Sequence, residues 1–440
     1  MQWMLKPGQK LVARGMQSAV TVEGILGEGA QAEVFCATVG SSQFALKWYR
    51  PEYLPNDARL WERLSVAIQN GSPTEQFLWP FDVVSVSRSG SYGGYLMPIK
   101  PPEFISLVDL IRRKAEPSFR VLCGVGFRLA HSFLKLHAAG LCYRDINFGN
   151  VFFDPATGDI RIADTDNVDV NLKPGAIKGT PGFMAPEVGR DEVLPNAASD
   201  RFSLAVLLFY IFMLGHPLKG QLESALPYDA ADPDGSHRLC VKNPLFVFDP
   251  GNATNRPDPD VHNNVLAFWP IYPESLRKLF TRAFTFGLFD FDARVMENEW
   301  RKEMRLLADM IFVCPNCSAE NFFDIERARN KSHLNPCWGC GGSLAYPPRM
   351  RIGDAYDASV VVLSEGVELF PHHLERDTYN FMRPLARVVS PPLGLLNLSP
   401  QAWTSSTLGG ELIETRPHER LALASARRIQ FGKWEAEVKV

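Results

Sequence analysis

Alternating apolar and polar residues predict a small β-rich region near the start of the chain. Two segments, 34–37 and 44–48, alternate with the period of two that half-buried strands show, so we expect them to pair as a hairpin. Residues 56–69 instead repeat apolar side chains at helical spacing, with Asn56 and Asp57 as candidate N-caps. One helix is therefore expected among the strands.

Beyond residue 97 the periodicity becomes that of longer helices, at about 118–139, 198–215 and 273–312. The segment 219–262 is rich in Pro, Asp, Asn and Gly, and we expect it to be a long surface insertion. Residues 350–440 contain short apolar segments separated by turn signals, which favours a small β-sandwich. This order of elements predicts an α+β protein with more than one domain.

The charge and the apolar segments of the chain limit the kinds of partner that we expect it to bind. The chain has 440 residues, a net charge of -3 and ordinary globular composition, so no global field attracts nucleic acid or an anionic membrane. The longest apolar run, Leu204 to Leu214, is too short for a hydrocarbon core of ~30 Å. The N-terminus has no apolar run typical of a secretory signal. We therefore expect a cytoplasmic protein without nucleic-acid or membrane partners.

A glycine-rich turn precedes the hairpin. Gly27 and Gly29 could let backbone N–H groups approach a polyphosphate, although a plain hairpin turn explains these glycines equally well. Lys47 follows two apolar residues on the second strand and could supply a cation for phosphate oxygens. The alternative for Lys47 is an exposed lysine at the edge of a strand.

A set of ordered motifs is far more specific. The segment LCYRDINFGNVFF at 141–153 is followed by IADTD at 162–166. These segments resemble the protein kinase superfamily, and the resemblance continues in the family's order through 179–187, 199–204, 215–217 and Arg294. It implies a bilobal protein kinase-like domain over about residues 20–312, with an N-lobe at 20–97 and a C-lobe at 98–312. It also implies ATP and Mg²⁺ as cofactors and a protein hydroxyl as the acceptor.

The resemblance assigns roles to individual residues. Asp145 would orient the acceptor hydroxyl and accept its proton, Asn150 and Asp164 would hold Mg²⁺, and Lys47 would contact the phosphates. Glu62 is the expected ion-pair partner of Lys47, with an exposed carboxylate as the alternative. Loop, strand and hinge residues would complete the nucleotide site: Gly27, Gly29, Val34, Ala45, Met97 and Ile99.

Other matching residues are expected to be structural. Glu187 and Arg294 resemble the buried ion pair of the family, and Asp200 resembles the helix-start aspartate that braces the catalytic loop. Thr180 resembles the threonine that contacts the catalytic aspartate in Ser/Thr kinases. This resemblance favours Ser/Thr over Tyr acceptors.

Four residues depart from the family pattern, and the mildest change is Ala32 in place of the third loop glycine. Asn147 stands where Ser/Thr kinases usually have a lysine, which predicts slower chemistry because one positive charge is missing. Thr165 and Asp166 replace the usual Phe and Gly, and Asp166 as an added metal ligand is a hypothesis. These changes keep open a nucleotide-binding pseudokinase scaffold as the alternative function. A small-molecule kinase is disfavoured by the protein-substrate motif at 179–187.

The loop after the magnesium aspartate offers no phosphorylation target. Between Asp166 and Gly179 there is no Ser, Thr or Tyr, although Arg144 precedes the catalytic aspartate as in kinases that bind a phosphorylated loop. We predict that activity does not depend on phosphorylation of this stretch. Asp169 is the candidate that takes the place of the phosphate.

Two cysteine pairs predict a zinc site. Cys314 and Cys317 are followed by Cys337 and Cys340, each pair with a two-residue spacer that suits one tetrahedral Zn²⁺. Because all four positions are protein ligands, the expected site is structural. Four thiols without metal are the alternative.

The kinase-like motifs followed by such a ribbon resemble bacterial tellurite-resistance kinases. That resemblance implies stress signalling, with a von Willebrand type A protein and a metal-dependent protein phosphatase as partners. The tail also resembles a forkhead-associated domain. We expect an N-terminal segment at 1–19, a zinc ribbon at 313–345 and a β-rich domain at 350–440 after the kinase-like domain.

Overall fold

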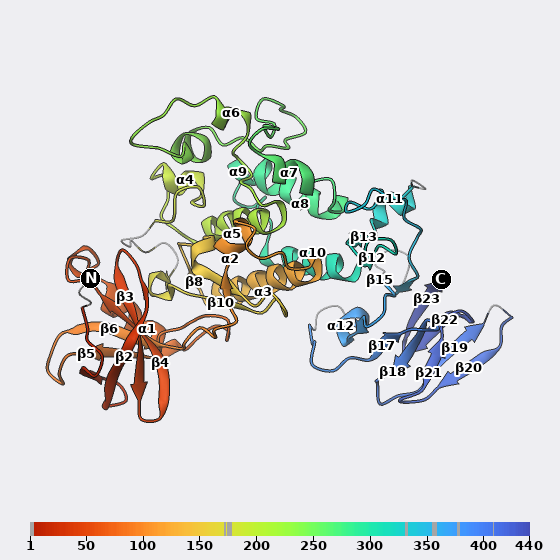
Figure 1. Cartoon of the computed structure of the whole chain (residues 1–440), viewed down its shortest axis with the longest axis horizontal. Helices are drawn as coiled ribbons and strands as arrows, with labels where there is room; N and C mark the ends of the chain where they lie inside the picture. The colour runs from red at the N-terminus through yellow and green to blue at the C-terminus, as the bar shows by residue number, and fades with distance from the viewer. Residues whose placement is uncertain are drawn as a thin grey trace. The chain divides into compact units, whose positions relative to one another are not determined.

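The computed structural model describes residues 4–170, 173, 178–330, 333–353, 359–375, 379–407 and 409–440. The chain forms two compact units, each considered by itself below. The first contains Met1–Pro270 with Leu276–Lys302, and the second contains Ile271–Ser275 with Glu303–Val440. Figure 1 traces the elements of both in chain order.

A closed β-barrel begins the first unit, with strand order β1-β2-β3-β4-β6-β5. Its strands are β1 (Lys10–Ala13), β2 (Ser18–Glu28), β3 (Ala32–Val39), β4 (Ser42–Tyr49), β5 (Asp82–Ser85) and β6 (Tyr92–Met97). The predicted hairpin is confirmed as β3 and β4, with Val34 opposite Lys47. Alternate side chains such as Val20, Val22 and Phe35 fill the barrel interior, as the period of two requires.

Helix α1 (Leu60–Asn70) lies beside the barrel (Figure 1). The helix buries Leu60 and Leu64, as predicted, and ends at Gly71 with a φ of 72°. The predicted caps are wrong, because the Asp57 carboxylate binds the Arg63 guanidinium instead of the helix N–H groups. The helix therefore begins at Leu60 without a side-chain cap.

The chain then turns helical, and the predicted long helices are confirmed. The elements are η1 (Leu54–Asn56) before α1, then β7 (Ile105–Ser106), α2 (Leu107–Ile111), α3 (Phe119–Ala138), β8 (Leu141–Cys142), η2 (Phe148–Asn150), β9 (Val151–Phe153), β10 (Ile160–Ile162), η3 (Thr165–Asn167), β11 (Asp169–Val170), α4 (Pro186–Gly189) and α5 (Ala197–Met213). Ser118 caps α3, and Asn196 forms a capping box at α5. Within the described part of the chain, no helix combines the length and apolar character that a bilayer crossing requires.

The segment 219–262, expected to be a surface insertion, is partly buried. It contains α6 (Gln221–Ser224) and the π-helix η4 (His237–Lys242), followed by α7 (Asn263–Phe268). Leu239, Cys240 and Val241 of η4 are buried. A Cβ on Gly189 of α4 would lie 2.6 Å from the Val241 side chain, so the two segments pack closely. This short buried stretch was not predicted, because the rest of the segment is polar.

The helical periodicity at 273–312 predicted helices there, and the structure has three: α8 (Glu274–Phe284), α9 (Phe286–Phe289) and α10 (Glu297–Asp309). A short hairpin follows, formed by β12 (Ile311–Val313) and β13 (Glu320–Phe322), and then α11 (Ile325–Arg329). The hairpin belongs to the second unit.

The C-terminal part of the second unit contains two antiparallel sheets. One has the order β15-β14-β23-β22-β19-β20 and the other β16-β17-β18-β21. The bounds are β14 (Arg349–Ile352), β15 (Ser359–Val362), β16 (Glu368–Leu369), α12 (Pro371–Leu374), β17 (Ala386–Val389), β18 (Gly394–Asn397), β19 (Trp403–Thr407), β20 (Leu412–Thr415), β21 (Arg420–Ala422), β22 (Ala426–Phe431) and β23 (Trp434–Lys439). Side chains of both sheets share one apolar core that includes Val361, Leu395 and Trp403. This packing is a β-sandwich, as the sequence predicts.

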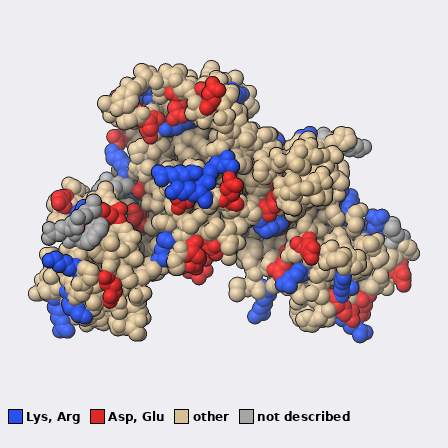
Figure 2. Space-filling view, in the orientation of Figure 1, with Lys and Arg blue, Asp and Glu red and all other residues tan. Residues whose placement is uncertain are grey.

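Surface charge is mixed on the face shown in Figure 2, where basic and acidic side chains are interspersed. This distribution accords with a net charge of only -3.

Candidate active site

A buried lysine lies at the centre of the candidate site. Strand β4 places Lys47 with 4% of its surface exposed. Its Nζ lies 3.2 Å from Asp164 Oδ1 and 2.9 and 3.0 Å from the two carboxylate oxygens of Asp166. Asp164 keeps 43% of its side chain exposed, whereas Asp166 keeps 1%. The lysine therefore joins a carboxylate that can reach a ligand to one that cannot.

Two tyrosines and an arginine enclose the Asp166 side. The Tyr49 hydroxyl donates to Asp166 Oδ2 at 2.5 Å, and the Tyr95 hydroxyl donates to Oδ1 at 3.4 Å. The Arg63 Nε donates to the Asp166 carbonyl at 3.2 Å. Lys47 and Tyr49 share one face of β4, and Tyr95 of β6 lies opposite Lys47.

The charges of this cluster stabilise one another. Burial alone would lower the pKa of the Lys47 ammonium, but the Asp166 and Asp164 carboxylates raise it above its usual value. Burial would raise the pKa of Asp166, but Lys47 and the Tyr49 hydroxyl hold it below its usual value. Burial and then the Asp166 charge raise the pKa values of Tyr49 and Tyr95 well above normal. Both tyrosines are therefore protonated donors at neutral pH.

The expected ion pair of Lys47 with Glu62 is wrong. Among the described residues, Lys47 forms its ion pairs with Asp164 and Asp166. Glu62 keeps 57% of its side chain exposed and pairs with Arg59 at 3.2 Å. The reason is helix phase, because α1 directs Leu60, Arg63 and Leu64 inward and leaves Glu62 on the outer face.

The predicted catalytic loop at 141–153 brings Asp145 and Asn150 together with Thr180 of a later segment. The Thr180 hydroxyl donates to Asp145 Oδ1 at 2.6 Å, and the Asn150 amide donates to Asp145 Oδ2 at 3.3 Å and to the Asp145 carbonyl at 3.0 Å. The Asn147 amide donates to Thr180 Oγ1 at 3.0 Å and to the Asp145 carbonyl at 3.1 Å. The Thr180 contact expected from the sequence is confirmed. Asp145 is thus held by two neutral donors that leave its charge uncompensated.

Buried ionic contacts support this loop. The Asp200 carboxylate accepts from the backbone N–H groups of Tyr143 and Arg144 at 2.5 and 2.9 Å, which confirms the predicted brace. The Arg294 guanidinium binds the Glu187 carboxylate at 2.8 and 2.9 Å, which confirms the predicted buried pair. Arg144 and Asp164 have φ values of 75° and 49°. Left-handed backbone at non-glycine residues is costly and is typical of functional sites, where the surroundings enforce it.

Asp169, in the segment that follows η3, pairs with two arginines. Asp169, which is 6% exposed, lies 3.4 Å from the Arg144 guanidinium and 3.1 Å from that of Arg59. Asp169 therefore links the catalytic loop to helix α1. Asp169 is the residue that we expect to take the place of a loop phosphate.

Four of the predicted nucleotide-site residues come together in the apolar cluster that also contains Leu60 and Leu64 of α1. Val34, Ala45, Met97 and Ile99 all belong to one apolar cluster, and Ala45 lies opposite Met97 in the ladder. A Cβ on Gly27 would meet nothing within 4 Å. The fold itself therefore does not require glycine there, which suits a backbone that a ligand approaches closely.

Comparison with known proteins agrees with this geometry. Residues 103–238 match the protein kinase domain family. This part of the chain is therefore similar to a protein kinase domain. The matched part includes Asp145, Asn150, Asp164 and Thr180, whereas Lys47 precedes it.

The curated relatives are named as kinases, and two of the three described here as Ser/Thr protein kinases. The Ser/Thr-protein kinase PknK of Mycobacterium bovis is 34% identical over 115 residues, which are 25% of this chain and 10% of that protein. The Ser/Thr-protein kinase drp72 of Corynebacterium efficiens is 26% identical over 209 residues, 46% of this chain and 40% of that protein. Rhodopsin kinase GRK1 of Rattus norvegicus is 39% identical over 93 residues, 20% of this chain and 16% of that protein. The chain thus covers about a tenth of PknK and well under half of drp72.

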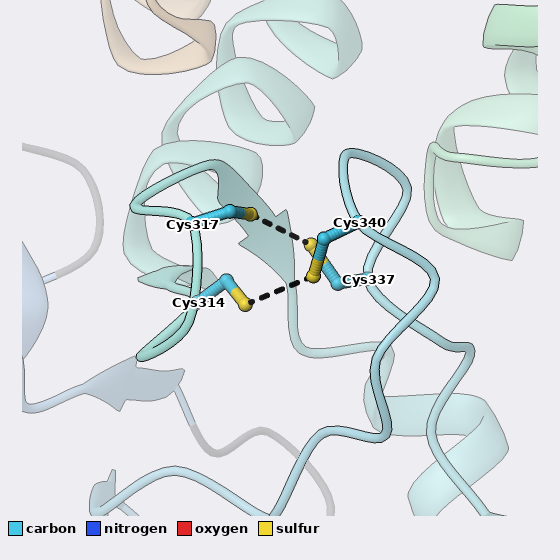
Figure 3. Close-up of side chains that lie close together, drawn as sticks. All are labelled: Cys314, Cys317, Cys337 and Cys340. Atoms are coloured by element: carbon cyan, nitrogen blue, oxygen red, sulfur yellow. Dashed lines mark hydrogen bonds between the residues drawn. The ribbon is translucent and has the colours of Figure 1, made fainter.

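Outside the kinase domain, the four predicted cysteines form one cluster (Figure 3). All four Sγ atoms lie within 4.8 Å of one another, with Cys314 and Cys340 3.8 Å apart and Cys317 and Cys337 3.6 Å apart. Four sulfurs at about 2.3 Å from one tetrahedral Zn²⁺ are about 3.8 Å apart, so the cluster fits that ion. The Asn321 amide donates to Cys337 Sγ at 3.5 Å. Burial would raise the pKa of Cys337, but backbone N–H groups and Asn321 lower it to about 6.

The two cysteine turns repeat the same backbone geometry. The N–H of Ser318 donates to the Cys314 carbonyl at 3.0 Å, and the N–H of Gly341 donates to the Cys337 carbonyl at 2.8 Å. Ser318 and Gly341 have φ values of 62° and 70°. Each pair is therefore held in a tight turn that directs both sulfurs to one point, as a zinc knuckle requires.

Sequence reasoning missed Asp166, Tyr49 and Tyr95 as neighbours of Lys47. One signal was available, since Tyr49 lies two residues beyond Lys47 on a strand and must share its face.

Proposed function

We propose that this protein is an ATP- and Mg²⁺-dependent Ser/Thr protein kinase. The observation that carries the proposal is the pairing of Asp145 with the Thr180 hydroxyl at 2.6 Å, together with a buried Lys47 bound to Asp164. PknK and drp72 add support, because both of these relatives are Ser/Thr protein kinases by name. When bound, Mg-ATP supplies the phosphoryl group and neutralises its developing charge.

The residues of the chain then act by positioning and charge. Asp145 orients the acceptor hydroxyl and accepts its proton, since its two oxygens are fixed by Thr180 and Asn150. Asn150 and Asp164 offer the oxygen ligands that hard Mg²⁺ prefers. Lys47 places a fixed positive charge beside the phosphates in a site that water cannot screen.

Acceptor preference follows from Thr180. Its hydroxyl donates to Asp145 while accepting from Asn147, so the loop is closed against the catalytic carboxylate. Because this threonine contact resembles the one in Ser/Thr kinases, it supports Ser or Thr as the acceptor.

The partners and the cellular setting are part of the proposal. Residues 20–312 would be the kinase domain, with Zn²⁺ held by Cys314, Cys317, Cys337 and Cys340 in a ribbon at 313–345. The ribbon and the β-sandwich of 350–440 would recruit partners, among them a von Willebrand type A protein and a metal-dependent protein phosphatase. The protein would act in the bacterial cytoplasm in stress signalling, where reduced cysteines can bind zinc.

The experiment is transfer of labelled phosphate from Mg-[γ-³²P]ATP to the protein itself and to a generic protein acceptor. Asp145→Asn should abolish transfer, and the melting temperature of this variant should equal that of the wild type. Asp292→Asn, an exposed aspartate of the same unit, is the matched control and should leave transfer unchanged. Nucleotide binding without transfer, also with candidate partners added, would favour the pseudokinase scaffold, for which the neutral Asn147 is the specific observation.

A further inference from the structure

We infer that Asp166, and no carboxylate of helix α1, is the positioning residue that fixes Lys47 in its phosphate-binding orientation. This inference rests on the proposed function, because it takes the same site as the nucleotide site. It concerns how the lysine is held, which the proposed roles leave unassigned.

The geometry of Asp166 suits an anchor. Both of its carboxylate oxygens contact Lys47 Nζ, at 2.9 and 3.0 Å. The same two oxygens accept from Tyr49 and Tyr95. With 1% of the side chain exposed, Asp166 has no free oxygen directed at solvent. The alternative that Asp166 is an additional Mg²⁺ ligand is therefore disfavoured, since that would require an oxygen facing the bound nucleotide.

Helix α1 presents a cation where a carboxylate would be needed. Its inward charged residue is Arg63, which is 5% exposed and binds Asp57 through both terminal nitrogens, at 2.7 and 2.5 Å. Arg63 also donates to the Asp166 carbonyl. Because Asp57 already pairs with Arg63, the inward face of α1 offers Lys47 no carboxylate, and Asp166 supplies the charge that a buried lysine needs.

The anchor is therefore in the same short segment as the metal aspartate. Asp164 and Asp166 flank Thr165, whose hydroxyl donates to the Leu78 carbonyl at 3.0 Å. A single turn, η3, thus holds both partners of Lys47. The lysine is positioned by this turn and the barrel, so no movement of α1 is needed to deliver a carboxylate.

The test compares nucleotides with and without phosphates. Calorimetric titration of the full chain with Mg-ATP and with adenosine should show that Asp166→Asn weakens Mg-ATP binding about tenfold to a hundredfold. Adenosine has no phosphates for Lys47 to contact, so its affinity should stay within about twofold. Glu62→Gln should leave both affinities unchanged.

A double-mutant cycle shows whether Asp166 acts through the lysine. On a Lys47→Met background, Asp166→Asn should weaken Mg-ATP binding by less than about threefold further, because the group that it positions is gone. Tyr49→Phe removes one donor to Asp166 but keeps all charges, and it should weaken Mg-ATP binding a few-fold with adenosine unaffected. Tyr49→Phe therefore replaces Asp166→Asn as the test variant if Asp166→Asn does not fold.

Three results would overturn the inference: additive effects in the cycle, an equal loss for adenosine, or a loss in Glu62→Gln as large as that in Asp166→Asn. Because these readouts are binding affinities, they stay separate from the proposed function. Wild-type protein that binds Mg-ATP but never transfers phosphate would refute the kinase activity and leave the anchor intact.

Discussion

Asp169→Asn tests whether a carboxylate replaces a loop phosphate in this protein. Asp169 lies between Arg144 of the catalytic loop and Arg59 at the start of α1, at 3.4 and 3.1 Å. The substitution removes the charge but keeps the size of the side chain. Its Oδ1 can still accept from the Val170 N–H, a contact of 2.8 Å in the native protein. Only the ionic link between the two elements is lost.

The expected cost follows from burial. The side chains of Asp169 and Arg144 are 6% and 2% exposed, and removing one member of a buried pair costs about 3–5 kcal/mol. Arg59 is 30% exposed and keeps its contact with Glu62, so its share is small. We therefore expect the free energy of unfolding to fall by about 3 kcal/mol. Phosphate transfer should fall about tenfold or more, because the catalytic loop loses its link to α1.

Thermal melting and a transfer assay on the same preparations measure both effects. Glu62→Gln is the matched control, since it removes the exposed partner of Arg59 and should change neither quantity much. Phosphatase treatment of the wild type should leave its activity unchanged, because no Ser, Thr or Tyr lies between Asp166 and Gly179. Wild-type stability and activity in Asp169→Asn would refute the reasoning, as would activation by phosphorylation of this loop.

Two further predictions concern pH and zinc. Burial would lower the pKa of His137, but hydrogen bonds to Asp200 and Glu297 raise it to about 9. Because folding raises this pKa, protonated His137 contributes its full stabilisation to the fold below about pH 6.5. This contribution is lost as the pH rises toward 9. His137→Gln should therefore flatten the fall in melting temperature between pH 6.5 and 9; an unchanged slope would contradict the assignment. Cys314→Ser should reduce bound zinc from one ion per chain to none by atomic emission, and retained zinc would exclude this ligand set.

Local sequence predicted much of the fold. The β3–β4 hairpin and the helices α3 and α5 were expected because their periodicity lies within short segments. The catalytic set around Asp145 was expected from motif order, and the structure brings Asp145, Asn150 and Thr180 into contact. Short-range patterns of this kind fix backbone conformation directly, so distant parts of the chain change them little.

The partner of Lys47 could not be predicted from the family pattern. The helix periodicity itself argued against Glu62, since a residue two positions from both Leu60 and Leu64 lies about 200° around the helix from each. Arg63 lies three positions after Leu60, on the buried face. The contact of Lys47 with Asp166 joins residues 119 positions apart, and it depends on tertiary packing that no local pattern encodes.

Asn147 is the departure with the most direct consequence for rate. The buried side chain, 8% exposed, donates to Thr180 and to the Asp145 carbonyl, so it fixes the loop but adds no charge. Its Oδ1 also accepts the Gly149 N–H at 2.8 Å and caps η2. Asn147→Lys should lose this cap, which costs about 1 kcal/mol of stability.

The same substitution would add a positive charge beside the catalytic aspartate. Loss of one donor to a developing oxyanion commonly lowers kcat about a hundredfold, so Asn147→Lys should raise kcat, by about tenfold if the added lysine is only partly aligned. Asn147→Met, of similar length but neutral, is the control and should lower the rate, because it loses the cap and both donors. A rate that falls equally in both variants would show that Asn147 acts through loop geometry and that the missing charge does not limit transfer.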